Sequence, residues 1–177
     1  MFFPKAGVGL GFDSTWDAGD RLIGRGWLSH DDGGKTRVLG VWAADSHRTP
    51  ATLDRLANEY ALREDLDASW AARPQTLLRE RDAAVLLLED PGGAPLADLL
   101  GEPMDPASFL DVAMAMTHAV GKLHQRGLIH KDLKPAHFLV AADPNRAWLI
   151  GFGIASRVPR GGDRKSTRLN SSHVKRS

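Results

Sequence analysis

The sequence predicts an α+β protein of two lobes, with a small antiparallel sheet and one helix first and a helical part second. Three observations support this fold class. Short β-like runs alternate with turn residues over residues 20–41 and return over 75–88. The Pro-Gly-Gly at 91–93 is the strongest break in the chain, and a long segment with helical spacing of apolar residues follows it.

The first lobe is expected over residues 13–90, after an N-terminal lead of residues 1–12. Apolar runs between turn signals predict strands at residues 21–23, 27–28, 37–42, 75–78 and 83–88. The Asp-Asp-Gly-Gly at 31–34 indicates a hairpin. A helix is expected to begin at Pro50, because Thr49 is a suitable N-cap and proline suits the first helical position.

The second lobe is expected over residues 91–160 and contains a long helix. This helix should begin at the Asp-Pro pair 105–106 and end at Gly127. Apolar residues at helical spacing mark its buried face: Phe109, Val112, Ala113, Met116, Val120 and Leu123. Two short apolar runs follow at 138–141 and 147–150, separated by an Asp-Pro-Asn turn.

Composition excludes several classes of protein. The chain of 177 residues is 42% hydrophobic and 25% charged, as is typical of a globular domain. It has no cysteine, which excludes disulfides and thiolate metal sites. No apolar run approaches the ~20 residues of a membrane span, and the start lacks the apolar region of a secretory signal. A cytoplasmic location without a membrane partner is therefore expected.

The positive charge of the chain is concentrated in residues 161–177, which are expected to form a disordered tail. Residues 164–177 hold five cations and no acid, so the 23 cations of the whole chain leave 18 against 22 acids for residues 1–163. One interpretation of the tail is a nucleic-acid or localisation patch. The favoured one is that it is not native, because it resembles the translated sequencing-adapter segment that ends many truncated reading frames. The mildly acidic body predicts no nucleic-acid partner.

Two segments of the second lobe carry the most specific motif. Residues 127–140 read Gly-Leu-Ile-His-Lys-Asp-Leu-Lys-Pro-Ala-His-Phe-Leu-Val, and residues 150–156 read Ile-Gly-Phe-Gly-Ile-Ala-Ser. They resemble the catalytic and metal-binding loops of eukaryotic-type protein kinases, in which H-R-D-L-x-x-x-N precedes D-F-G. The resemblance covers about residues 13–160 and implies a bilobal kinase fold with a five-stranded N-lobe, its helix C and an incomplete C-lobe. More narrowly, the chain is similar to the kinase-like N-terminal domain of large bacterial signalling proteins, in which a P-loop ATPase region and a sensor histidine kinase follow.

The resemblance implies that two catalytic residues are retained. Asp132 stands at the position of the aspartate that accepts the proton of the substrate hydroxyl, and Lys134 at that of the lysine that steadies the transferred phosphoryl group. Both are expected on the loop after the long helix. A solvated loop pair is the alternative interpretation.

Three other parts of the kinase machinery are replaced. His137 and Gly151 stand where the family has its two magnesium ligands, an asparagine and an aspartate, so no metal site is expected. Gly40 stands where the strand lysine is expected, aligned with V-A-I-K. On this strand Thr36, Val38 and Trp42 would share the face of Gly40, and none of them is a cation. The charged neighbours Lys35 and Arg37 would point to the opposite face. Glu59, at the place of the lysine's partner, is expected to be unpaired or to face solvent.

Two further groups of residues bear on whether the chain can bind a nucleotide. Gly24 and Gly26 are interpreted as the remnant of a glycine-rich phosphate loop, a weak signal that hairpin glycines explain nearly as well. An apolar slot for a purine is predicted from Ile23, Val38, Leu88 and Leu139, with backbone groups of the hinge around Glu89 and Pro91. Two alternatives stay open, namely metal-free binding of a nucleotide such as ATP, or a cleft filled by Trp42 or Phe152.

Three functions are therefore compared. The first is a catalytically impaired pseudokinase that binds a nucleotide or a partner protein and passes a signal to downstream domains. The second is a serine/threonine kinase that transfers phosphate from ATP at a low rate through Asp132. The third is a small-molecule phosphotransferase of the antibiotic-kinase type. The Lys-Pro pair at 134–135 and the Gly-Ile-Ala-Ser run after Phe152 favour the protein-kinase branch over the third.

Overall fold

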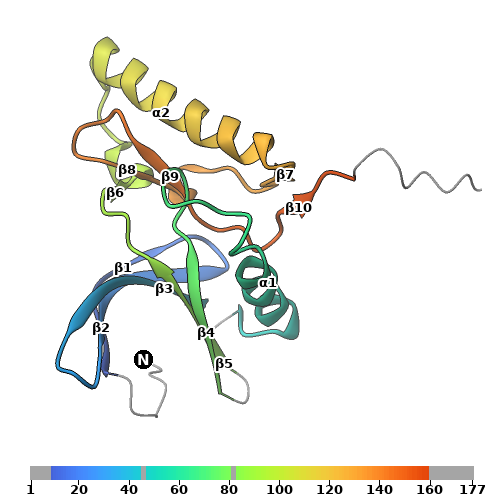
Figure 1. Cartoon of the computed structure of the whole chain (residues 1–177). Coiled ribbons are helices and arrows are strands. Elements are labelled where there is room, and N and C mark those ends of the chain that lie inside the picture. The colour runs from blue at the N-terminus through green and yellow to red at the C-terminus, as the bar shows by residue number, and fades with distance from the viewer. Residues whose placement is uncertain (1–8, 45–46, 81–82, 160–177) are drawn as a thin grey trace, which may run out of the picture.

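The computed structural model describes residues 9–44, 47–80 and 83–159, which form two lobes joined by residues 90–93 (Figure 1). No helix in these ranges is long and apolar enough to cross a membrane. The predicted tail of residues 161–177, most of the predicted lead and part of the turn at 79–82 lie outside the described residues.

The first lobe is a five-stranded antiparallel sheet with one helix against it. The order of the strands across the sheet is β1-β2-β3-β5-β4. Their bounds are Gly9–Asp17 for β1, Arg21–Ser29 for β2, Lys35–Ala43 for β3, Pro74–Glu80 for β4 and Ala83–Glu89 for β5. The helix is α1, Pro50–Ala61, and Thr49 caps it by accepting from the backbone N–H of Thr52, as predicted.

Two features of this lobe differ from the prediction. β1 begins at Gly9, inside the predicted N-terminal lead, because residues 9–17 pair with the whole length of β2. β2 is one continuous strand rather than two short runs. Its glycines interrupt the apolar pattern without ending the strand.

Each face of the sheet has its own apolar cluster. The face toward α1 and the second lobe carries Ile23, Leu39, Val41, Leu86 and Leu88, and Leu56 of α1 belongs to the same cluster. The opposite face carries Val38, Val85 and Leu87, with Phe12 and Trp42 packed beside them. The register of β2 and β3 therefore determines which side chains face the second lobe.

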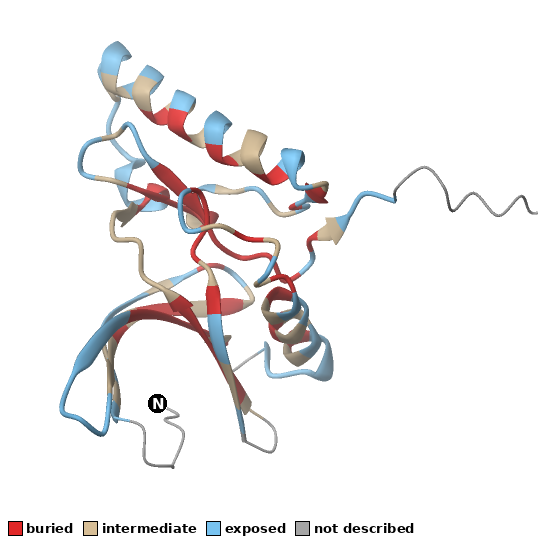
Figure 2. Cartoon of the chain, viewed as in Figure 1, coloured by how far each residue is buried: buried red, intermediate tan, exposed pale blue. Residues whose placement is uncertain are grey.

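The second lobe is built on α2, Pro106–Gln125, which Asp105 caps by accepting from the N–H groups of Ala107 and Ser108. Short elements lie beneath it (Figure 1): β6 Ala94–Pro95, η2 Leu96–Leu99, β7 Leu128–Ile129, η3 Pro135–His137, β8 Phe138–Val140, β9 Ala147–Leu149 and β10 Ser156–Arg157. Figure 2 shows that α2 is buried only along its inner side. The expectation that Phe109 belongs to that side is wrong, since its side chain is 59% exposed and Ala115 and Ala119 are buried instead.

Candidate functional site

The structure brings Asp132 and Lys134 together on the loop between β7 and η3. The lysine Nζ lies 3.3 Å from the carboxylate Oδ2, and both side chains are about one-third exposed. The loop is placed by the end of α2, where Gly127 adopts a left-handed backbone with φ 70° that most residues avoid. A carboxylate and an ammonium group are thus available at the surface between the lobes.

His130 fixes this loop to the segment before Gly151. Its Nε2 donates to the carbonyl of Ile150 at 2.9 Å, and its Nδ1 accepts from the N–H of Asp132 at 3.3 Å. Burial lowers the pKa of His130. Both ring nitrogens are therefore satisfied by the neutral imidazole, which acts as a structural anchor.

His137 is fully buried and bonds to the backbone of the loop that carries Asp132. Its Nδ1 donates to the carbonyl of Asp132 at 2.8 Å, while Nε2 has no hydrogen-bond partner among the described residues. Burial lowers the pKa of His137 to about 4, so the ring is neutral at physiological pH. The unprotonated Nε2 points toward Gly151.

Gly151 and His137 fit together as one packing unit. Gly151 has φ 81°, and a Cβ added to it would lie 2.7 Å from Cδ2 and Nε2 of the imidazole. The histidine ring therefore occupies the volume into which a side chain at position 151 would project. An aspartate cannot be added there without moving the ring.

Magnesium does not fit this donor set. Magnesium prefers oxygen ligands in octahedral geometry, whereas His137 offers one buried nitrogen and Gly151 has no side chain. The described part of the chain contains no group of three or more His, Asp or Glu side chains able to hold a metal ion. Residues 137 and 151 thus lack the side-chain oxygens that this ion requires.

Glu59 of α1 is neither unpaired nor exposed, so the expectation from the sequence is wrong. Its carboxylate is 0% exposed, with Oε2 lying 3.2 Å from Nη1 of Arg21 and Oε1 accepting from the N–H of Gly151 at 3.1 Å. Burial raises the pKa of Glu59, and the adjacent Arg21 opposes this. Glu59 is therefore paired with a cation of β2, Arg21.

Neighbouring Asn58 extends the same connection. Its side-chain amide donates to the carbonyls of Gly153 at 3.1 Å and Ala155 at 3.2 Å. Residues 151–155 are thus attached to consecutive residues of α1, and the position of the helix is fixed by contacts within the chain.

The register of β3 corrects the assignment of Gly40. A Cβ on Gly40 would lie 2.2 Å from Cζ of Phe12, on the face of the sheet opposite to α1. A lysine there would point away from Glu59. The β3 residues that pack in the same cluster as α1 are Leu39 and Val41, and both are uncharged.

Gly24 and Gly26 lie inside β2 and do not form a phosphate loop. A Cβ on Gly24 would meet Trp42 at 2.7 Å, and one on Gly26 would meet the carbonyl of Gly11 at 1.8 Å. Gly26 therefore lets the backbone of β1 pass close to β2, and Gly24 makes room for the rings of Trp42 and Phe12.

The turn between β1 and β2 is instead at residues 18–20. Ala18 is buried in the cluster between the lobes, and a Cβ on Gly19 would lie 3.6 Å from Nζ of Lys134. The turn therefore lies close to the loop that carries Lys134.

Three of the four apolar residues predicted for the purine slot lie in one cluster. Ile23, Leu88 and Leu139 share one cluster, in which Leu39 is also a member, and all are fully buried. Val38 lies on the opposite face of the sheet, so its assignment to the slot is wrong.

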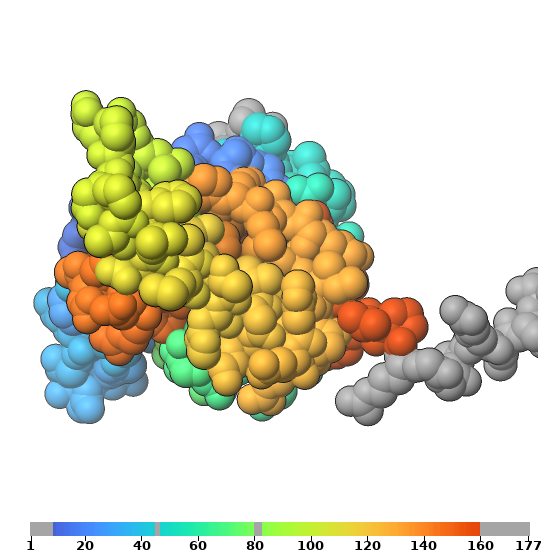
Figure 3. All heavy atoms as spheres, turned by 90° about the horizontal axis from the view of Figure 1, so that it is seen from above, coloured from blue at the N-terminus to red at the C-terminus, as the bar shows by residue number. Residues whose placement is uncertain are grey.

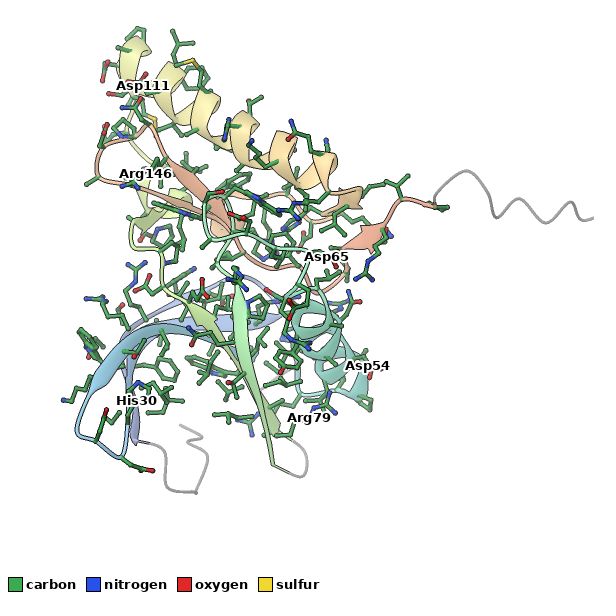
Figure 4. The ribbon with its side chains drawn as sticks, in the orientation of Figure 1. His30, Asp54, Asp65, Arg79, Asp111 and Arg146 are labelled. Carbon is green, nitrogen blue, oxygen red and sulfur yellow. The ribbon has the colours of Figure 1, made fainter. Side chains whose placement is uncertain are left out.

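The two aromatic residues expected to fill a collapsed cleft do not do so. Trp42 packs against Phe12, with 4.9 Å between ring centroids, on the far face of the sheet. Phe152 belongs to the core of the second lobe, edge-on to Trp70 at 6.4 Å. Side chains from both lobes nevertheless crowd the space between the ribbons (Figure 4).

The residues that the sequence did not single out are two arginines of β2, Arg21 and Arg25. The hairpin at 31–34 sets Ser29 opposite Lys35, and this register places Arg21 and Arg25 on the same face as Ile23. The alternation of side chains between the two faces of β2 could have placed both arginines beside Ile23, but the glycines of the strand suggested a loop.

Comparison with known proteins identifies similar chains. Residues 37–174 match the family described as protein kinase domain. The chain is 28% identical over 128 residues to serine/threonine-protein kinase pkn2 of Myxococcus xanthus, which covers 71% of this chain and 15% of that protein. It is 32% identical over 75 residues to PknB of Mycobacterium leprae, covering 41% and 12% respectively. The aligned part is thus a small fraction of the length of each relative.

Proposed function

Because the chain belongs to the protein kinase domain family, we propose that it is a pseudokinase, a kinase-like module impaired in phosphoryl transfer that passes a conformational signal to a partner protein or to downstream domains. Members of the family in general bind ATP and magnesium. Nucleotide binding without metal and partner binding are both compatible with this proposal. The proposal names only the kind of partner, a protein or a downstream domain, and no individual substrate.

The packing of His137 against Gly151 is the observation that carries the proposal. In this chain the imidazole fills the space of a side chain at position 151, and neither residue supplies an oxygen ligand. Losing one preorganised charge stabiliser in an active site costs about 10²–10³ in rate. Because the effects of several such losses do not simply multiply, we expect a large decrease in the rate of phosphoryl transfer without assigning it a combined factor.

The retained residues support a second candidate, a serine/threonine kinase of low rate. In this candidate Asp132 would accept the proton of a hydroxyl group, and Lys134, 3.3 Å from the Asp132 carboxylate, would hold an anionic oxygen. The relatives are named serine/threonine-protein kinases, which favours this candidate over a small-molecule phosphotransferase.

Phosphate transfer from radiolabelled ATP to the chain itself and to a general protein substrate separates the two candidates. The 177-residue chain is incubated with magnesium or manganese and compared with Asp132→Asn. We expect both proteins to show the same background. Transfer that is present in the parent chain and lost in Asp132→Asn would contradict the pseudokinase and establish the kinase.

A further inference from the structure

Arg25 of β2 extends across the boundary between the lobes. It lies opposite Leu39 of β3, on the face of the sheet that carries Ile23, and its side chain is only 17% exposed. The guanidinium group also lies 6.0 Å from the ring of Trp16 in β1. A long cationic side chain therefore lies beside the apolar slot, where its stem and head group take up space.

The partners of Arg25 are in the connection between the lobes. Its Nε forms an ion pair with Oδ2 of Asp90 at 2.9 Å, and its Nη2 donates to the carbonyl of Gly92 at 3.2 Å. The Asp90 side chain is 1% exposed and also receives a bond from Nε of Arg37 at 3.3 Å. Arg25 is thus held by two groups at once, one of them a buried carboxylate.

Several backbone groups of the hinge are already hydrogen-bonded within the chain. The N–H of Glu89 donates to the carbonyl of Arg73 at 2.8 Å, and the N–H of Gly92 donates to Oδ1 of Asp90 at 3.0 Å. Pro91 has no N–H, and Arg25 uses the carbonyl of Gly92. A base entering the slot would find these groups bonded within the chain.

We infer that Arg25 is an internal plug of the purine site. Its guanidinium takes the place at the hinge that the edge of a purine needs, and its ion pair with Asp90 keeps it there. The slot of Ile23, Leu39, Leu88 and Leu139 is consequently closed to nucleotides in the parent chain. This inference rests on the proposed function in one respect, namely that the site is a kinase-like nucleotide site.

The plug is tested by equilibrium titration with a fluorescent ATP analogue in EDTA, so that no metal is required. Arg25→Val removes the guanidinium and supplies an apolar wall. We expect it to bind the analogue at least tenfold more tightly than the parent chain. Arg37→Ala is the matched control, because it removes the other arginine from Asp90 at a half-exposed position and should bind like the parent.

A second variant guards against a folding defect. Removing Arg25 leaves the buried Asp90 with one cation, and uncompensated buried charge is strongly destabilising. Arg25→Val/Asp90→Asn removes both charges and is expected to show the same gain, with a cooperative thermal melt as the check on folding. Equal affinity of the parent and of a folded Arg25 variant would overturn the inference.

This outcome is distinguishable from failure of the proposed function. Unchanged affinity in the Arg25 variants refutes the plug and leaves the pseudokinase assignment intact. If the Arg25 variant gains nucleotide affinity together with Asp132-dependent phosphate transfer, the plug is supported and the impairment attributed to the metal positions is refuted.

Discussion

At the scale of single residues, His137 and Gly151 act as a pair. The ring fills the space beside the glycine, so a substitution at either position alters the packing at the other. Restoring one kinase-like residue alone therefore creates a clash or a cavity, and only a double change returns both side chains together.

Gly151→Asp is expected to lower the free energy of unfolding by about 2–4 kcal/mol, from steric overlap with His137 and from its positive φ. The double variant His137→Asn/Gly151→Asp should recover at least half of this loss. Urea denaturation measures both.

Gly33→Asp serves as the control for this experiment. Gly33 has φ 82°, close to that of Gly151, but nothing lies within 4 Å of its Cβ position. It should carry the backbone strain alone, about 1 kcal/mol. An equal loss for both single variants would show that the imidazole does not restrict position 151.

The buried imidazole of His137 also predicts a pH dependence of stability. Its pKa is about 4 in the folded chain against an ordinary value of 6.5, so the unfolded chain takes up the proton first as pH falls. Stability contributed by the neutral ring is present above pH 6.5 and is lost as pH falls toward 4.

This loss reaches up to about 1.4 kcal/mol per pH unit relative to His137→Asn, measured as the difference in free energy of unfolding. The comparison cancels the opposite trend expected from Glu59, whose pKa is raised. His118→Asn on the exposed side of α2 controls for the loss of an imidazole. A pH-independent difference between the parent and His137→Asn would contradict the prediction.

At the scale of elements, α1 is connected to β2 and to residues 151–155 through Glu59 and Asn58. Arg21 supplies the charge that lets the Glu59 carboxylate remain in a fully buried position. We expect Arg21→Met to cost roughly 3–5 kcal/mol, because it leaves that carboxylate without its cation.

The double variant Arg21→Met/Glu59→Gln should be clearly more stable than Arg21→Met alone, since it removes the stranded charge. Urea denaturation of the two single variants and the double variant gives the coupling between the two positions. Additive losses would mean that Arg21 and Glu59 do not stabilise each other.

Local patterns predicted the helices better than the faces of the strands. Thr49 and Asp105 each carry a side-chain cap and precede a proline, so the starts of α1 and α2 follow from neighbouring residues. The orientation of Gly40 depends instead on how β1 and β3 pair with β2, which no local pattern specifies.

The candidate site divides in the same way. Asp132 and Lys134 belong to one short motif, so their proximity follows from neighbouring residues. The partner of Glu59 is Arg21, which is 38 positions away and is brought near only by the packing of α1 on the sheet. β1 was missed in part because its alternation of exposed residues is interrupted by glycines and by a register shift between Phe12 and Ser14.

At the scale of the whole molecule, the outer side of α2 is not covered by any other described part of the chain. Figure 3 shows this helix spread over the face of the molecule seen from above. The large apolar side chains exposed there include Phe109, Leu110 and Met114. Contiguous apolar surface of this kind favours self-association.

We expect the chain by itself to be marginally stable or to aggregate, as measured by light scattering during size-exclusion chromatography. Replacing Leu110 and Met114 by lysine should increase the monomeric fraction without lowering the melting temperature. Thr117→Lys/His118→Lys adds the same charge at exposed polar positions of the helix and should not. A monomeric parent chain with a cooperative melt would contradict the prediction.

The shared carboxylate of Asp90 has a mechanical consequence. It ties the connection between the lobes to β2 through Arg25 and to β3 through Arg37. A ligand that displaced Arg25 from Asp90 would leave the connection between the lobes with one ion pair, to the half-exposed Arg37. The angle between the lobes would then vary more when the slot is filled. Occupancy would then be reported to the rest of a larger protein as a change in stiffness, without any chemical step.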